Sequence, residues 1–241
     1  MIPIGDRNPT RRFPIVNYLL VAANVALFVY ELSLGGPGLE RFIDTWGVRS
    51  TEVIALLGGD LTRLRLVLLT SLVSMFLHGG WLHILSNMLF LWIFGDNVED
   101  NFGSVAYLIF YLLSGFGAVV AQSLLTPGSQ VPSIGASGAI SGVLAAYLLL
   151  YPRASVRAIL PIPILFFFPF FVPAWLMIII WFGGQLLNGY AVLTDAVQMT
   201  GGVAYGAHIG GFVVGLLLTA VFRKPRRPPR YEYYQQRYYR R

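Results

Sequence analysis

The chain has 241 residues, of which 56% are hydrophobic and 12% charged, and its mean hydropathy is +0.67. A soluble domain carries about 25% charged residues, so this composition is that of a membrane protein. The absence of cysteine excludes disulfides, thiolate catalysis and Cys-ligated metals, and the net charge of +6 is distributed as membrane topology would require.

The hydropathy pattern predicts six membrane-spanning helices in one domain, because about 20 apolar residues cross the hydrocarbon of a bilayer. The first span has too long an apolar run for a cleaved signal peptide and no small-residue cleavage site after it. The predicted fold class is therefore an all-α membrane protein. The six spans lie near Phe13–Leu34, Met75–Gly95, Val105–Leu125, Ser137–Tyr151, Ile159–Phe182 and Val203–Phe222.

The segments outside the spans differ in character. The long connection from Gly35 to Ser74 holds amphipathic stretches, which predict short helices lying at the outer membrane interface. Residues 1–12 form an N-terminal segment, residues 13–222 the six-span domain, and residues 223–241 a basic tail. We expect this tail to be disordered and close to anionic lipid, and we expect no nucleic-acid partner.

The basic residues predict the orientation. Thirteen of the 17 Lys and Arg residues fall in segments that share one side of the membrane if both termini lie on that side. The positive-inside rule therefore places both termini in the cytoplasm. The compact six-span form suggests a bacterial inner membrane.

Four polar residues lie at similar depth on three of the spans. Ser137 lies about 24 Å and His208 about 22 Å from the cytoplasmic ends of their helices, at 1.5 Å rise per residue. His83 lies about 20–25 Å from its own, and Asn87 is one turn further along the same face. Ionisable residues inside a membrane are costly and are usually functional. A structural histidine or an interhelical hydrogen bond is the alternative interpretation for each residue alone.

The fourth span opens on "GASGAISG", in which glycines flank Ser137. Gly138 and Gly142 form a G-x-x-x-G pattern, and the sixth span repeats it. Small residues four apart let two membrane helices approach closely. The glycines therefore predict either simple packing of spans four and six, or packing that brings Ser137 to His208.

The chemistry that these residues allow is nucleophilic. A serine hydroxyl becomes reactive when a neutral imidazole takes its proton, so Ser137 and His208 form a candidate dyad. Asn87, a ring N–H of His83 and the free backbone N–H groups at the start of the fourth span can donate to an oxyanion. No carboxylate lies on the spans at this depth, and no cluster has metal-site spacing. We therefore expect no metal and no cofactor.

The remaining polar residues are interpreted as structural. Asn17, Asn24 and Gln185 are predicted to make helix–helix hydrogen bonds. Glu31 is placed in a solvated loop or at a helix end, as is Asp195, and His78 is placed near the interface or in a supporting role.

Three motifs together resemble the rhomboid family of intramembrane serine proteases. They are "HGGWLHILSNM" (78–88), "GASG" (135–138) and "AHIGGFVVG" (207–215), in order on spans two, four and six. The resemblance implies a six-helix bundle in which Ser137 is the nucleophile and His208 the general base. It also implies that His83 and Asn87 stabilise the oxyanion.

The sequence departs from the family in one place beside the dyad. Some members carry an aromatic residue four positions after the serine that packs against the histidine, whereas this chain has Ser141. Tyr205 could replace part of that contact. The proline-rich fifth span resembles the mobile gate helix of the family.

The hypothesis is an endopeptidase that hydrolyses peptide bonds in or beside transmembrane helices of membrane-protein substrates. Two other functions stay open from the sequence. One is a catalytically silent relative that binds membrane helices, and the other is a small transporter or channel lined by the same polar groups.

Overall fold

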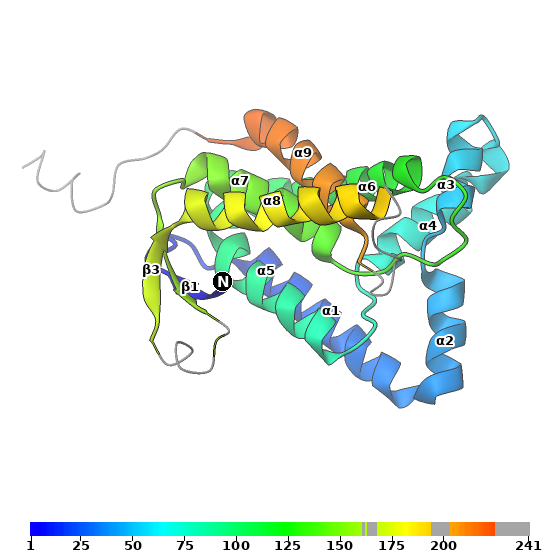
Figure 1. Ribbon diagram of the computed structural model, residues 1–241, viewed down its shortest axis with the longest axis horizontal. Helices are drawn as coiled ribbons and strands as arrows, with labels where there is room; N and C mark the ends of the chain where they lie inside the picture. The colour runs from blue at the N-terminus through cyan, green and yellow to red at the C-terminus, as the bar shows by residue number, and fades with distance from the viewer. Residues whose placement is uncertain (161, 163–167, 194–202, 225–241) are drawn as a thin grey trace, which may run out of the picture.

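The computed structural model describes residues 1–160, 162, 168–193 and 203–224, and the basic tail from residue 225 lies outside this part. Ten helical segments and three strands are found there (Figure 1). The helices are α1 Ile15–Ser33, α2 Gly35–Trp46, α3 Ser50–Leu57, η1 Leu61–Arg63, α4 Leu64–Ser74, α5 Trp81–Phe102, α6 Ser104–Leu125, α7 Ser137–Leu150, α8 Ala174–Leu193 and α9 Tyr205–Phe222. The strands are β1 Ile2–Asp6, β2 Ser155–Ile159 and β3 Phe170–Pro173.

The all-α membrane class is confirmed. Four of the described helices are long and apolar enough to cross a bilayer, namely α1, α6, α8 and α9. The other two predicted spans correspond to α7, which is apolar but has only 14 residues, and to α5. Helix α5 has 22 residues and carries three acidic residues near its C-terminal end.

Two predicted helix starts are wrong. The fifth span was expected from Ile159, but α8 begins at Ala174 after strands β2 and β3. Proline has no backbone N–H and cannot continue a helix interior, and Pro169 and Pro173 delay the start accordingly. Helix α5 begins at Trp81 and not near Met75, because Gly80 adopts a φ of 157° outside the helical region.

A three-stranded antiparallel sheet, which the hydropathy pattern did not predict, has the order β1-β2-β3. The strand β2 follows α7 and the strand β3 leads directly into α8, so the sheet joins the ends of these two helices (Figure 1). Two backbone hydrogen bonds continue this link. They run from Ala174 N to Ala154 O at 2.9 Å and from Trp175 N to Pro152 O at 3.0 Å. The start of α8 is thereby fixed to the end of α7.

The connection between α1 and α5 contains the predicted short helices, which are α2, α3, η1 and α4. Their predicted place at the membrane interface stays a prediction. The connection contacts the segment before α7 through an antiparallel bridge between Val48 and Ser133. A second bond runs from Gly135 N to Ser74 O at 2.8 Å. These contacts hold the chain just before Ser137.

The glycines of α7 and α9 bring the two helices into backbone contact, as the G-x-x-x-G pattern predicted. A Cβ atom added to Gly211 would lie 2.0 Å from the carbonyl oxygen of Gly138. One added to Gly215 would lie 2.4 Å from the Cα atom of Gly142. Neither distance is compatible with a side chain, so only glycine allows this approach.

Helices α7 and α9 also pack closely against α6. A Cβ on Gly138 would lie 2.5 Å from the Cβ of Ala118, and one on Gly210 would lie 2.1 Å from the Cβ of Ala121. Helices α6, α7 and α9 therefore form the most closely packed part of the bundle. This packing fixes the position of the N-terminal ends of α7 and α9, which carry Ser137 and His208.

Polar contacts join α1 to its neighbours. The Asn17 side chain donates to Leu91 O at 3.1 Å and accepts from the Tyr107 hydroxyl at 2.8 Å, so its predicted helix–helix bonding is confirmed. Asn24 instead donates to Leu20 O within its own helix. The buried carboxylate of Glu99 accepts from the N–H groups of Val16 and Asn17, which have no partner inside α1.

Candidate active site

Ser137 and His208 are in hydrogen-bond contact at the N-terminal ends of two adjacent helices. Ser137 is the first residue of α7, and His208 lies in the first turn of α9. The distance from Ser137 Oγ to His208 Nε2 is 2.7 Å. A neutral imidazole in this position can accept the hydroxyl proton.

Helix α8 holds the other side of the His208 ring. The amide oxygen Oε1 of Gln185 lies 2.7 Å from His208 Nδ1. The Trp181 ring, one turn earlier on the same face, lies 5.9 Å from the imidazole between centroids. Tyr205 contributes an edge contact with a centroid distance of 6.4 Å. The imidazole is therefore held by side chains of α7, α8 and α9.

His83 faces the segment that leads into α7. Gly135 has a φ of 122°, and a Cβ added to it would lie 2.6 Å from His83 Nε2 and 3.8 Å from Ser137 Oγ. The other ring nitrogen, Nδ1, accepts from Gly79 N at 3.4 Å. Because Nδ1 is the acceptor, a neutral His83 carries its proton on Nε2, on the side of Ser137.

Asn87 is held by the fully buried His78. The Asn87 amide nitrogen lies 3.0 Å from His78 Nε2, and His78 Nδ1 lies 3.2 Å from Phe76 O. A carbonyl only accepts, so Nδ1 carries the proton and Nε2 accepts from Asn87. One N–H of the Asn87 amide is used in this bond, and the second N–H remains for another acceptor.

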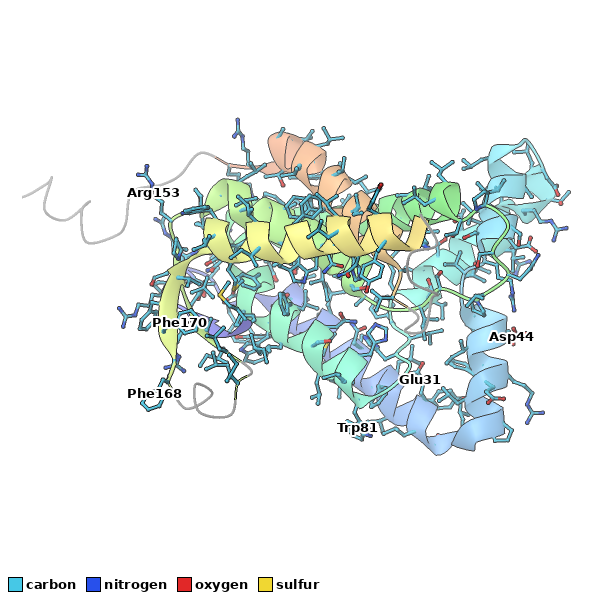
Figure 2. All side chains as sticks on the ribbon, in the orientation of Figure 1. Glu31, Asp44, Trp81, Arg153, Phe168 and Phe170 are labelled. Carbon is cyan, nitrogen blue, oxygen red and sulfur yellow. The ribbon has the colours of Figure 1, made fainter. Side chains whose placement is uncertain are left out.

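Glu31 reinforces His78 from α1. It lies in the last turn of that helix, so it is at a helix end as one of the two expectations had it, but it is only 1% exposed and not in a solvated loop. Both carboxylate oxygens accept from His78 N at 3.2 Å. Figure 2 shows Glu31 and Trp81 at the same end of the α1–α5 pair, where the chain enters α5. The buried carboxylate is satisfied by a backbone donor that would otherwise lack a partner.

A small cavity of about 40 Å³ adjoins Ser137. It lies between α6, the segment before α7 and the helices of the α1–α5 connection. Its walls combine small or polar residues, such as Ser74, Gly115 and Gln122, with larger apolar side chains such as Met75 and Ile134. Gln122 is fixed there, because its Oε1 accepts from Ala207 N at 3.1 Å. The cavity can accept a small side chain or water beside the serine.

Within the part of the chain that the structure describes, no group of three or more His, Asp or Glu side chains could hold a metal ion. We assign no cofactor-binding residues.

The structure brings together Ser137 and His208 and places His83 beside them, with Asn87 next to His78. Sequence reasoning missed the relation of Gln185 to this site. Gln185 does make a helix–helix hydrogen bond, but its partner is His208. The sequence signal for this role is the spacing of four residues between Trp181 and Gln185, which places both side chains on the face of α8 that packs against α9.

The comparisons with known proteins agree with the motifs. The family model described as Rhomboid domain matches residues 65–225. The chain belongs to the rhomboid family. This match covers the chain from α4 to α9 and therefore includes Ser137, His208, His83, Asn87 and Gln185.

Three rhomboid relatives differ in source. The chain is 36% identical to the rhomboid protease GluP of Bacillus subtilis over 145 residues, which are 60% of this chain and 26% of that protein. It is 27% identical to the rhomboid protease AarA of Providencia stuartii over 220 residues, 84% of this chain and 70% of that protein. It is 33% identical to rhomboid-like protein 11, chloroplastic, of Arabidopsis thaliana, over 62% of this chain and 50% of that protein. This chain thus spans half or less of two of these relatives.

Proposed function

We propose that this rhomboid family member is an intramembrane serine endopeptidase that uses Ser137 as nucleophile and His208 as general base. The observation that carries the proposal is the 2.7 Å contact between Ser137 Oγ and His208 Nε2. Two bacterial relatives that are named rhomboid proteases support the same reaction class. The proton of Ser137 passes to Nε2 as Oγ attacks a peptide carbonyl, and Nε2 then returns it to the leaving amine.

The oxyanion of the tetrahedral intermediate is proposed to be stabilised by His83 and Asn87 together with the start of α7. His83 carries its free N–H on the side of Ser137, and Asn87 keeps one unused amide N–H. Helix α7 has no side-chain N-cap bond, so its first backbone N–H groups remain available as donors. These donors also lie at the positive end of the helix dipole.

The proposed substrate is a transmembrane helix of another membrane protein that unwinds near the cut. A helix hides its peptide carbonyls in hydrogen bonds, so small or helix-breaking residues should surround the cleaved bond. The small, partly polar cavity beside Ser137 fits a small substrate side chain. The same lining can hold the water that hydrolysis of an acyl-enzyme requires.

The proposed topology places both termini in the cytoplasm, and we propose a bacterial inner membrane as the location. The distribution of basic residues supports the orientation. The bacterial source of GluP and AarA supports the location, although the chloroplastic relative shows that the family also occurs in organelles.

The test compares wild type with Ser137→Ala in detergent micelles, using a fluorophosphonate probe and a model single-span substrate. Wild type should be labelled and should cleave the substrate, whereas Ser137→Ala should do neither. Ser33→Ala is the matched control, because Ser33 is exposed and bonds only to Tyr30 O within α1. It should behave as wild type.

A folded wild type that neither reacts with the probe nor cleaves the substrate would instead favour the silent helix-binding relative. Acidification gives a second check. Cleavage should fall as His208 becomes protonated, because an imidazolium cannot accept the serine proton.

A further inference from the structure

The His208 imidazole has two hydrogen-bond partners, and they come from different helices. Nε2 lies 2.7 Å from Oγ of Ser137 in α7, and Nδ1 lies 2.7 Å from Oε1 of Gln185 in α8. Among the residues that the structure describes, no carboxylate bonds to His208. The amide of Gln185 therefore occupies the place where a serine hydrolase triad has its acidic residue.

In a neutral imidazole one ring nitrogen carries the proton and only the other can accept a hydrogen bond. The partner of Nδ1 therefore influences whether Nε2 can take the serine proton. If Nδ1 carries the proton, Nε2 is free to take the proton of Ser137. If Nε2 carries it, the ring can only donate to the serine and cannot act as base. An amide oxygen at Nδ1 accepts a hydrogen bond, so it favours the first form.

Position 141 of α7 does not supply an aromatic contact to His208. Ser141 is buried, and its hydroxyl donates to the carbonyl of Ser137 at 2.7 Å, so no aromatic ring of α7 covers His208. The ring contacts come instead from Trp181 on α8 and Tyr205 on α9. Gln185 and Trp181 are four residues apart, so one face of α8 supplies both a hydrogen bond and a ring contact.

We propose that Gln185 is a positioning residue that holds His208 in the tautomer with the proton on Nδ1, so that Nε2 is the base. This inference rests on the proposed function. During attack the serine proton moves to Nε2, and the Nδ1 proton stays on Nδ1 in its bond to Gln185 Oε1. The amide oxygen then also faces the imidazolium and stabilises it, though less than a carboxylate would.

The amide could also present its NH₂ group to Nδ1, which would select the other tautomer. The two orientations make opposite predictions. With Oε1 facing the ring, loss of the amide should lower the rate of the chemical step. With NH₂ facing the ring, loss of the amide should leave the rate unchanged or raise it.

The experiment compares wild type, Gln185→Leu and Gln185→Glu, with Asn188→Leu as the matched control. Asn188 is exposed on the next turn of α8, and its amide donates only to Gly184 O of its own helix. Cleavage of the single-span substrate is measured as kcat and KM across pH. The histidine tautomers are read from ¹⁵N NMR spectra of histidine-labelled protein, with a His208→Gln spectrum to assign the His208 signals.

Gln185→Leu should lower kcat by about 10- to 100-fold, with little change in KM, because only general-base catalysis is weakened. Its His208 signals should show a mixture of tautomers, whereas wild type shows the Nδ1–H form. Gln185→Glu should retain activity, and the acidic limb of its pH profile should move to higher pH, because a carboxylate favours the imidazolium. Among the described residues, the titratable groups that face His208 are Tyr205 and His83, and these variants leave both unchanged.

Wild-type kcat in Gln185→Leu, with an unchanged tautomer, would overturn the inference and leave Gln185 as a packing residue. An equal loss in Asn188→Leu would overturn it as well, because the effect would then belong to α8 in general. If Gln185→Leu does not fold, the inference is tested by the pH profile of Gln185→Glu and by the His208 tautomer in that variant. A wild type without activity would refute the proposed function, while the NMR spectra would still test the effect of Gln185 on His208.

Discussion

Two of the interfaces of helix α9, those with α7 and α8, are built in opposite ways. Against α7 the contact is made by backbone, since Gly211 and Gly215 leave no room for a Cβ atom. Against α8 the contact is made by long side chains: Phe182 stacks on Phe212 at 4.1 Å, and Gln185 bonds to His208. Two of the three glycines of α8, Gly183 and Gly184, have no neighbouring atom within 4 Å of an added Cβ, and at Gly189 the added Cβ would lie 3.3 Å from a side-chain atom of Ile209.

The difference separates two requirements of the site. The distance between Ser137 and His208 depends on how closely two backbones approach, and backbone contacts allow little variation. The orientation of the imidazole depends on side chains from a helix that is held less closely. The first interface should therefore control whether the site exists, and the second how well it works.

The largest effect is expected from Gly211→Ala, which breaks the backbone interface. The new methyl group would lie 2.0 Å from the carbonyl oxygen of Gly138, and the backbone cannot move aside as a side chain can. We expect a loss of about 3 kcal/mol in the free energy of unfolding together with loss of cleavage. Unfolding in mixed micelles, followed by circular dichroism, measures the first quantity. Wild-type stability in this variant would contradict the close approach of α7 and α9.

An intermediate effect is expected from Phe182→Ala, which weakens only the α8 interface. Loss of the stack on Phe212 should cost about 1 kcal/mol, and cleavage should fall because α8 no longer holds Gln185 against His208. The control is Leu187→Ala on the same helix, since Leu187 is 73% exposed. An equal decrease in cleavage for both variants would show that the stack has no particular role.

The smallest effect is expected from Gly183→Ala, the counterpart of Gly211→Ala. Open space surrounds the new methyl group, and alanine favours a helix over glycine by about 1 kcal/mol. We expect equal or slightly higher stability with unchanged cleavage, measured as for the other variants. A large loss of stability would mean that α8 packs more closely there than its contacts indicate.

The sequence predicted most of the helices because a bilayer imposes a simple rule of length and hydropathy. The starts of α1, α6 and α7 were each placed within two residues of the observed ones. The rule failed at the start of α8, because the apolar residues Phe170–Pro173 satisfy hydropathy but form strand β3. It also could not find the β1–β2 pairing, which joins residues more than 140 positions apart.

The sequence by itself therefore predicted most of the helices and the close approach of α7 and α9 through glycine, and it predicts a common depth for Ser137, His208, His83 and Asn87. Those properties follow from local pattern, namely hydropathy, glycine spacing and the rise of a helix. Only the tertiary structure decided which group each histidine nitrogen faces, because a hydrogen bond depends on where the folded backbone places its two atoms. Gly79 faces His83 and Phe76 faces His78 at the entry to α5, whereas the partner of His208 is Gln185, 23 residues away on another helix.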